Sequence, residues 1–126
     1  MNNENSRRIL RGDVYYANLG ETVGSVQGRT RPVVIVQNNT GNKFSPTIVI
    51  VPLTSVNKKE RQPTHTYIGK SFGLIAESIA LAEQITTIDK CSLHDYIGHI
   101  NCGTMKRLEA AILISVGIES GGEHRD

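Results

Sequence analysis

Two runs of β-branched residues constrain the fold of this chain more than any other feature of its sequence. Residues 32–37 read Pro-Val-Val-Ile-Val-Gln, and residues 47–55 read Thr-Ile-Val-Ile-Val-Pro-Leu-Thr-Ser. Short apolar runs of this kind predict buried strands rather than helices. Pro32 fits the first position of the first strand, and Pro52 indicates a bulge or an exposed edge near the end of the second. The chain is therefore expected to form a sheet around these two strands.

The rest of the chain predicts shorter strands and a single helix. Alternating or β-branched segments predict strands at residues 13–19, 64–69, 78–89 and 95–100, the third of them as one strand or two with a bend. Residues 38–46 have the composition of a turn. The one convincing helix is predicted at residues 104–118, with Asn101 or Thr104 as its cap. Together these elements predict a mainly β (α+β) fold, a small barrel of twisted antiparallel strands with a C-terminal helix.

The length of 126 residues fits one domain. We expect a disordered N-terminal tail at residues 1–10, a single domain at residues 11–119 and a polar tail at residues 120–126. The sequence contains no apolar stretch near the roughly 20 residues that span a membrane, and its first ten residues lack the apolar centre of a signal peptide. The expected location is the cytoplasm, with no membrane partner.

The charges of the chain are unevenly distributed. The net charge is only +2, but residues 1–63 carry nine Lys/Arg against four Asp/Glu, whereas residues 64–126 carry five against eight. An anionic ligand is therefore expected to meet the N-terminal half.

One segment has residues of the zinc-binding type. Residues 91–102 contain Cys91, His94, His99 and Cys102, with only four residues between the two Cys/His pairs. Finger-like zinc sites separate their ligand pairs by roughly 12 residues or more. We therefore expect no metal site here, and two reduced thiols in a cytoplasmic protein.

A polar loop leads into the first buried strand. Gly24 and Gly28 let its backbone approach a ligand closely, and Arg31 stands where the loop meets the strand. The guanidinium of Arg31 would be held by a rigid strand beside a segment that can change shape. An arginine fork forms paired hydrogen bonds to phosphate oxygens, so this position suits an anionic substrate.

Three blocks of the sequence resemble the MazF/PemK/Kid family of bacterial toxin endoribonucleases, in particular the MazF branch of Gram-positive bacteria. They are Gly-Asp-Val at 12–14, Gly-x-x-x-Gly-x-x-Arg-Pro-Val at 24–33, and Gln84 followed by Thr-Ile-Asp at 87–89. The resemblance implies an SH3-like barrel that forms a homodimer and cuts single-stranded RNA at a short sequence without a metal or other cofactor. It also implies a MazE-like antitoxin as partner, with operator DNA bound only through the antitoxin complex.

The resemblance also implies roles for individual residues. Arg31 and Thr54 match the catalytic pair, and the RNA-binding positions are matched by Ser25, Gln27, Gly28, Arg29, Ser55 and Gln84. His65 is a further candidate, because a histidine titrates near neutral pH and can act as a general acid or base. Leu81 and Glu83 stand where members of the Kid branch use an arginine and an acid, so a mechanism built on those groups does not transfer.

The chemistry expected of this family suits these residue types. The 2′-hydroxyl of RNA can attack the neighbouring phosphorus, leaving a 2′,3′-cyclic phosphate and a 5′-hydroxyl, so the protein needs no nucleophile of its own. Arg31 would neutralise charge on the phosphoryl oxygens, and Thr54 would bind a phosphate oxygen or orient the 2′-hydroxyl. Without the resemblance, Thr54 would read as an ordinary strand threonine.

Two other functions fit the same fold class. One is a non-catalytic SH3-like module that binds nucleic acid, which agrees with the charge distribution and the glycine-bracketed loop. The other is a gyrase poison like the CcdB toxins, which resemble one another at a C-terminal helix ending in tryptophan, glycine and isoleucine. This chain contains no tryptophan, so the gyrase function rests on the fold alone.

Overall fold

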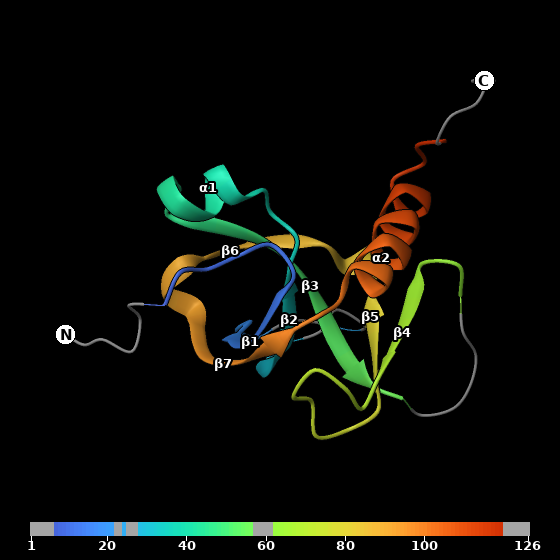
Figure 1. Ribbon diagram of the computed structural model, residues 1–126, viewed down its shortest axis with the longest axis horizontal. Helices are drawn as coiled ribbons and strands as arrows, with labels where there is room; N and C mark the ends of the chain where they lie inside the picture. The colour runs from blue at the N-terminus through green and yellow to red at the C-terminus, as the bar shows by residue number, and fades with distance from the viewer. Residues whose placement is uncertain (1–6, 22–23, 25–27, 57–61, 120–126) are drawn as a thin grey trace.

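The structure, a computed structural model, describes residues 7–21, 24, 28–56 and 62–119. The strands in this part of the chain are β1 (Asp13–Asn18), β2 (Thr30–Ile35), β3 (Thr47–Ser55), β4 (His65–Gly69), β5 (Ser78–Leu81), β6 (Thr86–Asp89) and β7 (Leu93–His99). The helices are α1 (Asn39–Phe44) and α2 (Cys102–Ser115), with short 3₁₀ turns η2 (Ala82–Gln84) and η3 (Lys90–Ser92) (Figure 1). The predicted segment 78–89 thus forms two strands joined by a bend.

All strand pairs in the described part of the chain are antiparallel. The order is β4-β5-β3-β2-β1-β7, and β6 pairs with β3 as well. β3 is therefore the central strand: β2 lies along one edge, and β6 and then β5 lie along the other. This arrangement confirms the mainly β fold with a C-terminal helix.

Pro52 is buried in the middle of β3, so the prediction of an exposed edge at this residue is wrong. β6 pairs with β3 as far as Ile50, and β5 begins to pair at Leu53. The proline thus lies in a gap between two ladders, where a missing N–H breaks no strand pairing on that edge. Pro32 likewise lies beyond the last β2–β3 pair, and it is the third residue of its strand rather than the first.

Both faces of the central strands are buried, as the β-branched runs predict. The inner cluster lies between β1, β2, β3, β6 and β7, and it contains Tyr15, Ala17, Val33, Ile35, Ile48 and Ile50. The helix-side cluster lies on the other face and joins Val14, Val34, Val51 and Leu53 to Met105 and Leu108 of α2. Because side chains alternate along a strand, neighbouring residues such as Val33 and Val34 stabilise opposite faces.

The helix α1 corrects the prediction of a simple turn at residues 38–46. The side chain of Asn38 accepts a hydrogen bond of 2.8 Å from the Gly41 amide and so caps the helix. The buried Asn42 side chain donates to the carbonyl oxygen of Gln37, and its own carbonyl accepts a hydrogen bond from the Gln37 side chain. The asparagine side chains thus form hydrogen bonds to free backbone groups at the ends of a helix and a strand, in addition to favouring a turn.

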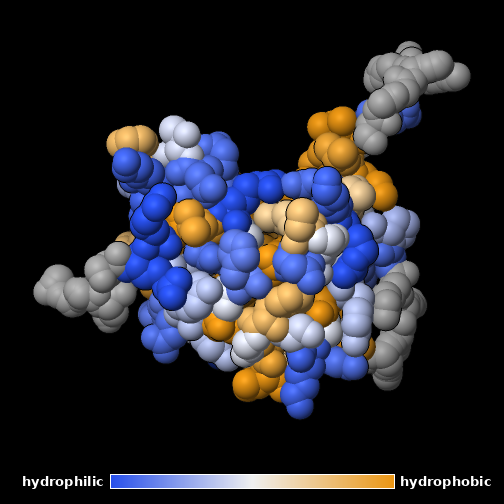
Figure 2. Space-filling view, viewed as in Figure 1, coloured by the Kyte–Doolittle hydropathy of each residue, from blue (hydrophilic) through white to orange (hydrophobic). Residues whose placement is uncertain are grey.

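α2 begins two residues earlier than predicted and ends at Ser115. Asn101 is its cap, because the Asn101 side chain accepts a hydrogen bond of 2.8 Å from the Thr104 amide. The end of α2 and the residues that follow it leave Ile114, Val116 and Ile118 exposed, which Figure 2 shows as an apolar surface at the upper right. Neither α1 nor α2, nor any other helix of the described residues, is long and apolar enough to cross a membrane.

Part of the predicted N-terminal tail is packed against the domain. Ile9 contacts the inner cluster, and the amide of Leu10 donates to the Asp13 carboxylate. The ordered region of the described chain therefore begins before Arg11. Residues 1–6 and 120–126, which complete the predicted tails, lie outside the described residues.

Candidate active site

The register of β2 and β3 relates Arg31 to Thr54. The last pair that joins the two strands is Val33 with Pro52. Continuing this register by two residues on each strand sets Arg31 opposite Thr54. Because every second residue shares a face, Arg31 lies on the face of Val33 and Thr54 on the face of Pro52, so both are on the same side of the sheet. The continued register therefore puts the two residues of the predicted catalytic pair, 23 residues apart in sequence, at the neighbouring ends of β2 and β3.

β2 and β3 are not paired with each other at this point. Beyond Val33 and Pro52 the β2–β3 ladder stops, while Thr54 continues to pair with Ile79 of β5 on its other edge. Arg31 in turn continues to pair with Ala17 of β1. The ends of β2 and β3 are thus each paired along one edge, and they are not paired with each other beyond Val33 and Pro52.

The Arg31 side chain is oriented by the loop that precedes it. Its Nε donates a hydrogen bond of 3.0 Å to the carbonyl oxygen of Gly28. The two terminal nitrogens of the guanidinium have no hydrogen bond or ion pair to any described residue. Arg31 is only half-buried, so it presents a fixed, charged fork whose paired donors are available to an anion.

The loop is closed at its base by backbone hydrogen bonds. The Arg29 amide donates to the carbonyl oxygen of Gly20 at 2.6 Å, and the Leu19 amide donates to the carbonyl oxygen of Arg29 at 2.9 Å. Arg29 has a φ of 61°, which is unfavourable for a residue other than glycine. Its side chain is exposed. These two hydrogen bonds and the strained backbone of Arg29 fix where the loop enters β2 and therefore where Arg31 lies.

The other predicted RNA-binding residues lie in different places. Ser55 is exposed at the end of β3, next to Thr54, and pairs with Ser78. Thr54 pairs with Ile79 near the start of β5, whereas Gln84 lies in η2, which follows the end of β5. Within one protomer, Gln84 therefore does not lie beside Arg31. Ser25 and Gln27 lie outside the described residues.

His65 lies apart from the Arg31–Thr54 pair. Thr54 pairs with Ile79, and Ile79 pairs with Tyr67 of β4, two residues along from His65. His65 is thus about 10 Å across the sheet from Thr54 and about 7 Å further along it. Its Nε2 is 3.6 Å from a carboxylate oxygen of Glu83. Within one protomer, the structure does not bring His65 to the same position as the other two residues.

The Gly-Asp-Val block holds the fold together. Asp13 is buried, and its carboxylate accepts from the Leu10 amide and lies 2.8 Å from Nδ1 of His99. A Cβ at Gly12 would stand 3.1 Å from the His99 ring, so the small residue lets the ring pack on the backbone. This arrangement joins β1 to the end of β7.

The Cys/His segment is spread over several elements. Cys91 is in η3, His94 and His99 are in β7, and Cys102 begins α2. Both cysteines are free and exposed. Among the described residues, no three His, Cys, Asp or Glu side chains come together in a way that could hold a metal ion.

Sequence reasoning missed a group of basic residues around a cavity. Arg7 and Arg8 were assigned to the tail, and Lys43 and Lys90 were not singled out, yet all four line the same cavity. The sequence did contain one signal for this group: the dipeptide Arg7-Arg8 directly precedes the apolar Ile9, and Ile9 packs against the inner cluster.

The fold and the site define a class of protein: a small antiparallel β protein that presents an arginine fork and a threonine at open strand ends, suited to a phosphate group. A family model described as "PemK-like, MazF-like toxin of type II toxin-antitoxin system" matches residues 10–116. The chain therefore belongs to the family of PemK-like and MazF-like toxins.

Two curated relatives agree with this assignment. The chain is 43% identical over 111 residues to the endoribonuclease EndoA of Bacillus subtilis, covering 87% of this chain and 96% of the relative. It is 44% identical over 118 residues to the endoribonuclease MazF of Staphylococcus saprophyticus, covering 93% and 98%. Both organisms are Gram-positive, in agreement with the branch that the sequence indicated.

Solved structures of the family have the same fold. A mycobacterial endoribonuclease superposes with a TM-score of 0.72 at 30% identity, over 91% of this chain and 97% of that one. A mycobacterial endoribonuclease in complex with its cognate antitoxin gives a TM-score of 0.71 at 30% identity, over 90% and 98%. MazF of Deinococcus radiodurans gives a TM-score of 0.76 at 16% identity, over 90% and 100%, which supports the fold.

Proposed function

We propose that this protein is an endoribonuclease toxin that cuts single-stranded RNA at the open ends of β2 and β3. The curated relatives, over 40% identical across nearly their whole length, are named as endoribonucleases. The observation that supports the proposal is the register of β2 and β3, which pairs Val33 with Pro52 and, continued by two residues, puts Arg31 opposite Thr54.

The proposed reaction uses the substrate's own nucleophile. The 2′-oxygen forms a bond to the neighbouring phosphorus as its proton leaves, the bond from phosphorus to the 5′-oxygen breaks, and the departing oxygen takes up a proton. The products are a 2′,3′-cyclic phosphate, or a 3′-phosphate after hydrolysis, and a 5′-hydroxyl. The chemistry assigned to the protein is positioning and neutralisation of negative charge.

Arg31 is proposed to stabilise the charge on the phosphoryl oxygens. Its Nε is held by Gly28, so the terminal nitrogens can form two parallel hydrogen bonds to these oxygens with little loss of side-chain entropy. Arginine stays protonated in proteins, which suits a fixed positive charge better than proton transfer.

Thr54 is proposed to orient the 2′-hydroxyl or a phosphate oxygen. It is half-buried on the central strand, with Ile79 paired on one edge, and its hydroxyl makes no hydrogen bond to a described residue. A β-branched side chain on a strand has few rotamers, so the hydroxyl is held in place. His65 is too far along the sheet to join this pair within one protomer.

We further propose a homodimer that a MazE-like antitoxin inhibits, with operator DNA bound only through that complex. A relative of known structure is an endoribonuclease bound to its cognate antitoxin. The exposed Ile114, Val116 and Ile118 at the end of α2 are apolar surface that a second subunit can bury. The cytoplasm is the proposed location, where messenger RNA is single-stranded and accessible.

The proposed function is tested by incubating a long RNA of mixed sequence with the purified protein in excess chelator and mapping the ends. We expect cuts at one short sequence, with 5′-hydroxyl ends, and growth arrest when the protein is expressed in bacteria without an antitoxin. RNA that stays intact at high protein concentration would contradict the proposal. Incubation with gyrase and supercoiled DNA would then test the gyrase function.

A substitution at Thr54 tests its proposed role separately. Thr54→Val keeps the β-branched shape but removes the hydroxyl, so we expect kcat to fall about 10- to 100-fold, the value of one hydrogen bond to a charged group. The unfolding free energy should change by less than about 1 kcal/mol. Thr54→Ser keeps the hydroxyl and is the matched control, with activity near that of the wild type. A Thr54→Val variant with full activity would return Thr54 to a purely structural role.

A further inference from the structure

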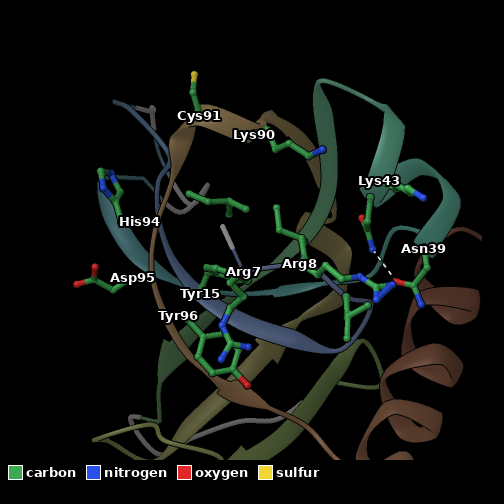
Figure 3. A pocket seen from close by; sticks show the side chains of 14 residues that line it. Arg7, Arg8, Tyr15, Asn39, Lys43, Lys90, Cys91, His94, Asp95 and Tyr96 are labelled. Atoms are coloured by element: carbon green, nitrogen blue, oxygen red, sulfur yellow. Dashed lines mark hydrogen bonds between the residues drawn. The ribbon is translucent and has the colours of Figure 1, made fainter. Parts of the chain in front are cut away.

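A large cavity lies on the other side of β1 from Arg31. It has a volume of about 970 Å³ and is bordered by the N-terminal segment, α1, η3 and β7 (Figure 3). Leu93 lines it and pairs with Ala17, which in turn pairs with Arg31. Tyr15 of β1 lines it as well and pairs with Val33, two residues along β2 from Arg31, so the nearest wall is one strand from Arg31, about 5 Å across the sheet and about 7 Å along it. We refer to it as the basic cavity.

The basic cavity is lined by four positively charged side chains and one acidic side chain. Arg7 and Arg8 come from the N-terminal segment, Lys43 from α1 and Lys90 from η3. Among the described residues, none of these four forms an ion pair. Asp95 is the acidic residue of the lining, and Figure 3 shows its carboxylate directed away from the centre of the cavity. Three segments of chain, rather than one flexible run, thus place uncompensated positive charge around one concave space.

A buried hydroxyl in the lining lacks a partner. Tyr15 is only 6% exposed, and its hydroxyl makes no hydrogen bond within the described part of the chain. Burial, together with the nearby Asp13 carboxylate, raises the pKa of Tyr15 to about 12. The group is therefore a protonated hydrogen-bond donor at neutral pH. A buried polar group without a partner costs free energy, which a ligand with an acceptor oxygen would offset.

The aromatic side chains hold one of the arginines in place. The guanidinium carbon of Arg7 is 3.6 Å from the centroid of the Tyr96 ring. Tyr96 in turn packs edge-on against Tyr15, with 5.5 Å between the ring centroids. A guanidinium stacked on a ring keeps its N–H groups at the edge of the plane, where they can still bind an anion. The cavity thus offers positioned donors as well as charge.

We propose that the basic cavity binds the phosphate group of a nucleotide, with the Tyr15 hydroxyl and the four basic side chains as its donors. The phosphate can come from a free nucleotide or from an RNA strand that extends past the active site, and the latter source rests on the proposed function. Phosphate oxygens match the cavity because each accepts several charge-assisted hydrogen bonds.

The test measures binding of two probes by calorimetry: AMP, and a mixed-sequence RNA with 2′-O-methyl groups throughout, which cannot be cleaved by its own 2′-hydroxyl. The double variant Lys43→Ala/Lys90→Ala removes two cavity charges. Lys70→Ala/Lys106→Ala removes two exposed charges elsewhere and is the matched control. Tyr15→Phe removes only the hydroxyl, and thermal unfolding of each variant shows whether it remains folded.

We expect the Kd for AMP to rise at least tenfold in Lys43→Ala/Lys90→Ala and about fivefold in Tyr15→Phe, with the control unchanged. Tyr15→Phe should unfold at the wild-type temperature or above it, because it loses an unsatisfied buried group. For RNA, the slope of log K against log salt should fall by roughly 0.7 for each phosphate group that the variant no longer neutralises.

The two probes separate the sources of the phosphate. Weaker binding of both AMP and RNA supports a site for a free nucleotide, and weaker binding of RNA alone supports a site for the strand. Equal binding by the cavity variant and the control overturns the proposal. Arg31→Ala should still bind AMP in the cavity, so a failure of the proposed cleavage function is distinguishable from a failure of this site.

Discussion

Replacing Arg31 by alanine is expected to lower kcat for RNA cleavage about 1000-fold, the upper range for losing one preorganised charge-stabilising group. The loss should fall on kcat because the guanidinium acts on charge that develops as the 2′-oxygen attacks. The side chain is half-buried and bonds only the Gly28 carbonyl among the described residues, so stability should change little. The measurement is single-turnover cleavage of the mapped RNA, beside thermal unfolding.

Two further variants sharpen the interpretation of Arg31→Ala. Arg31→Lys keeps the charge but loses the planar fork, so its activity should lie between that of alanine and the wild type. Lys106→Ala removes an exposed charge on α2 and should leave kcat unchanged. In bacteria, Arg31→Ala should no longer arrest growth. A variant that cuts at the wild-type rate would remove Arg31 from the mechanism and leave the open strand ends without a catalytic role.

The largest expected effect on stability is that of Gly98→Ala in β7. A Cβ at Gly98 would stand 2.0 Å from the carbonyl oxygen of Phe72, and one at Gly73 would stand 2.2 Å from the carbonyl oxygen of Ile97. The turn at residues 72–73 therefore lies directly on the backbone of β7, while Phe72 and Ile97 pack against the helix-side cluster. Backbone atoms cannot yield as a flexible side chain can, so the strand or the turn must move. We expect the unfolding free energy to fall by more than about 3 kcal/mol, measured by urea denaturation.

Gly103→Ala is the matched control for this prediction. Gly103 lies in the first turn of α2, and the nearest atom to an added Cβ is 3.7 Å away. Alanine loses less backbone entropy than glycine in a helix, so this variant should be up to about 1 kcal/mol more stable than the wild type. If Gly98→Ala unfolds at the same urea concentration as Gly103→Ala, the close contact between β7 and the turn is wrong.

The local patterns of the sequence were sufficient for most of the fold. The β-branched runs predicted β2 and β3 because a strand buried on both faces needs apolar residues at consecutive positions. Asn101 and Thr104 were both candidate caps for α2, because a side-chain cap acts within three residues, and the structure shows that Asn101 is the cap. The helix α1 was missed because asparagine and glycine favour turns as well as helix caps. The helix is stabilised here by the buried hydrogen bonds between Asn42 and Gln37, which form only in the folded chain.

The candidate site divides in a similar way. Arg31 could be singled out from the sequence, because the change from a glycine-bracketed loop to an apolar run is a local signal. Thr54 could be named only from the family resemblance, since a threonine on a strand has no distinguishing local pattern. His65 illustrates the limit: its chemistry is suitable, but the pairing of β3, β5 and β4 sets it along the sheet from Thr54.

The sequence by itself determined which segments become strands, that a helix follows the last strand and which arginine stands at the entrance to a buried strand. These features depend on side-chain alternation and on hydrogen bonds within a few residues. Only the tertiary structure decided that the β2–β3 ladder stops short of Arg31 and Thr54, that β3 changes partners at the buried Pro52, and that four basic residues line one cavity. Those features depend on the register between strands that are distant in sequence. The register is selected because it buries both faces of the sheet at once, so it is a property of the whole fold.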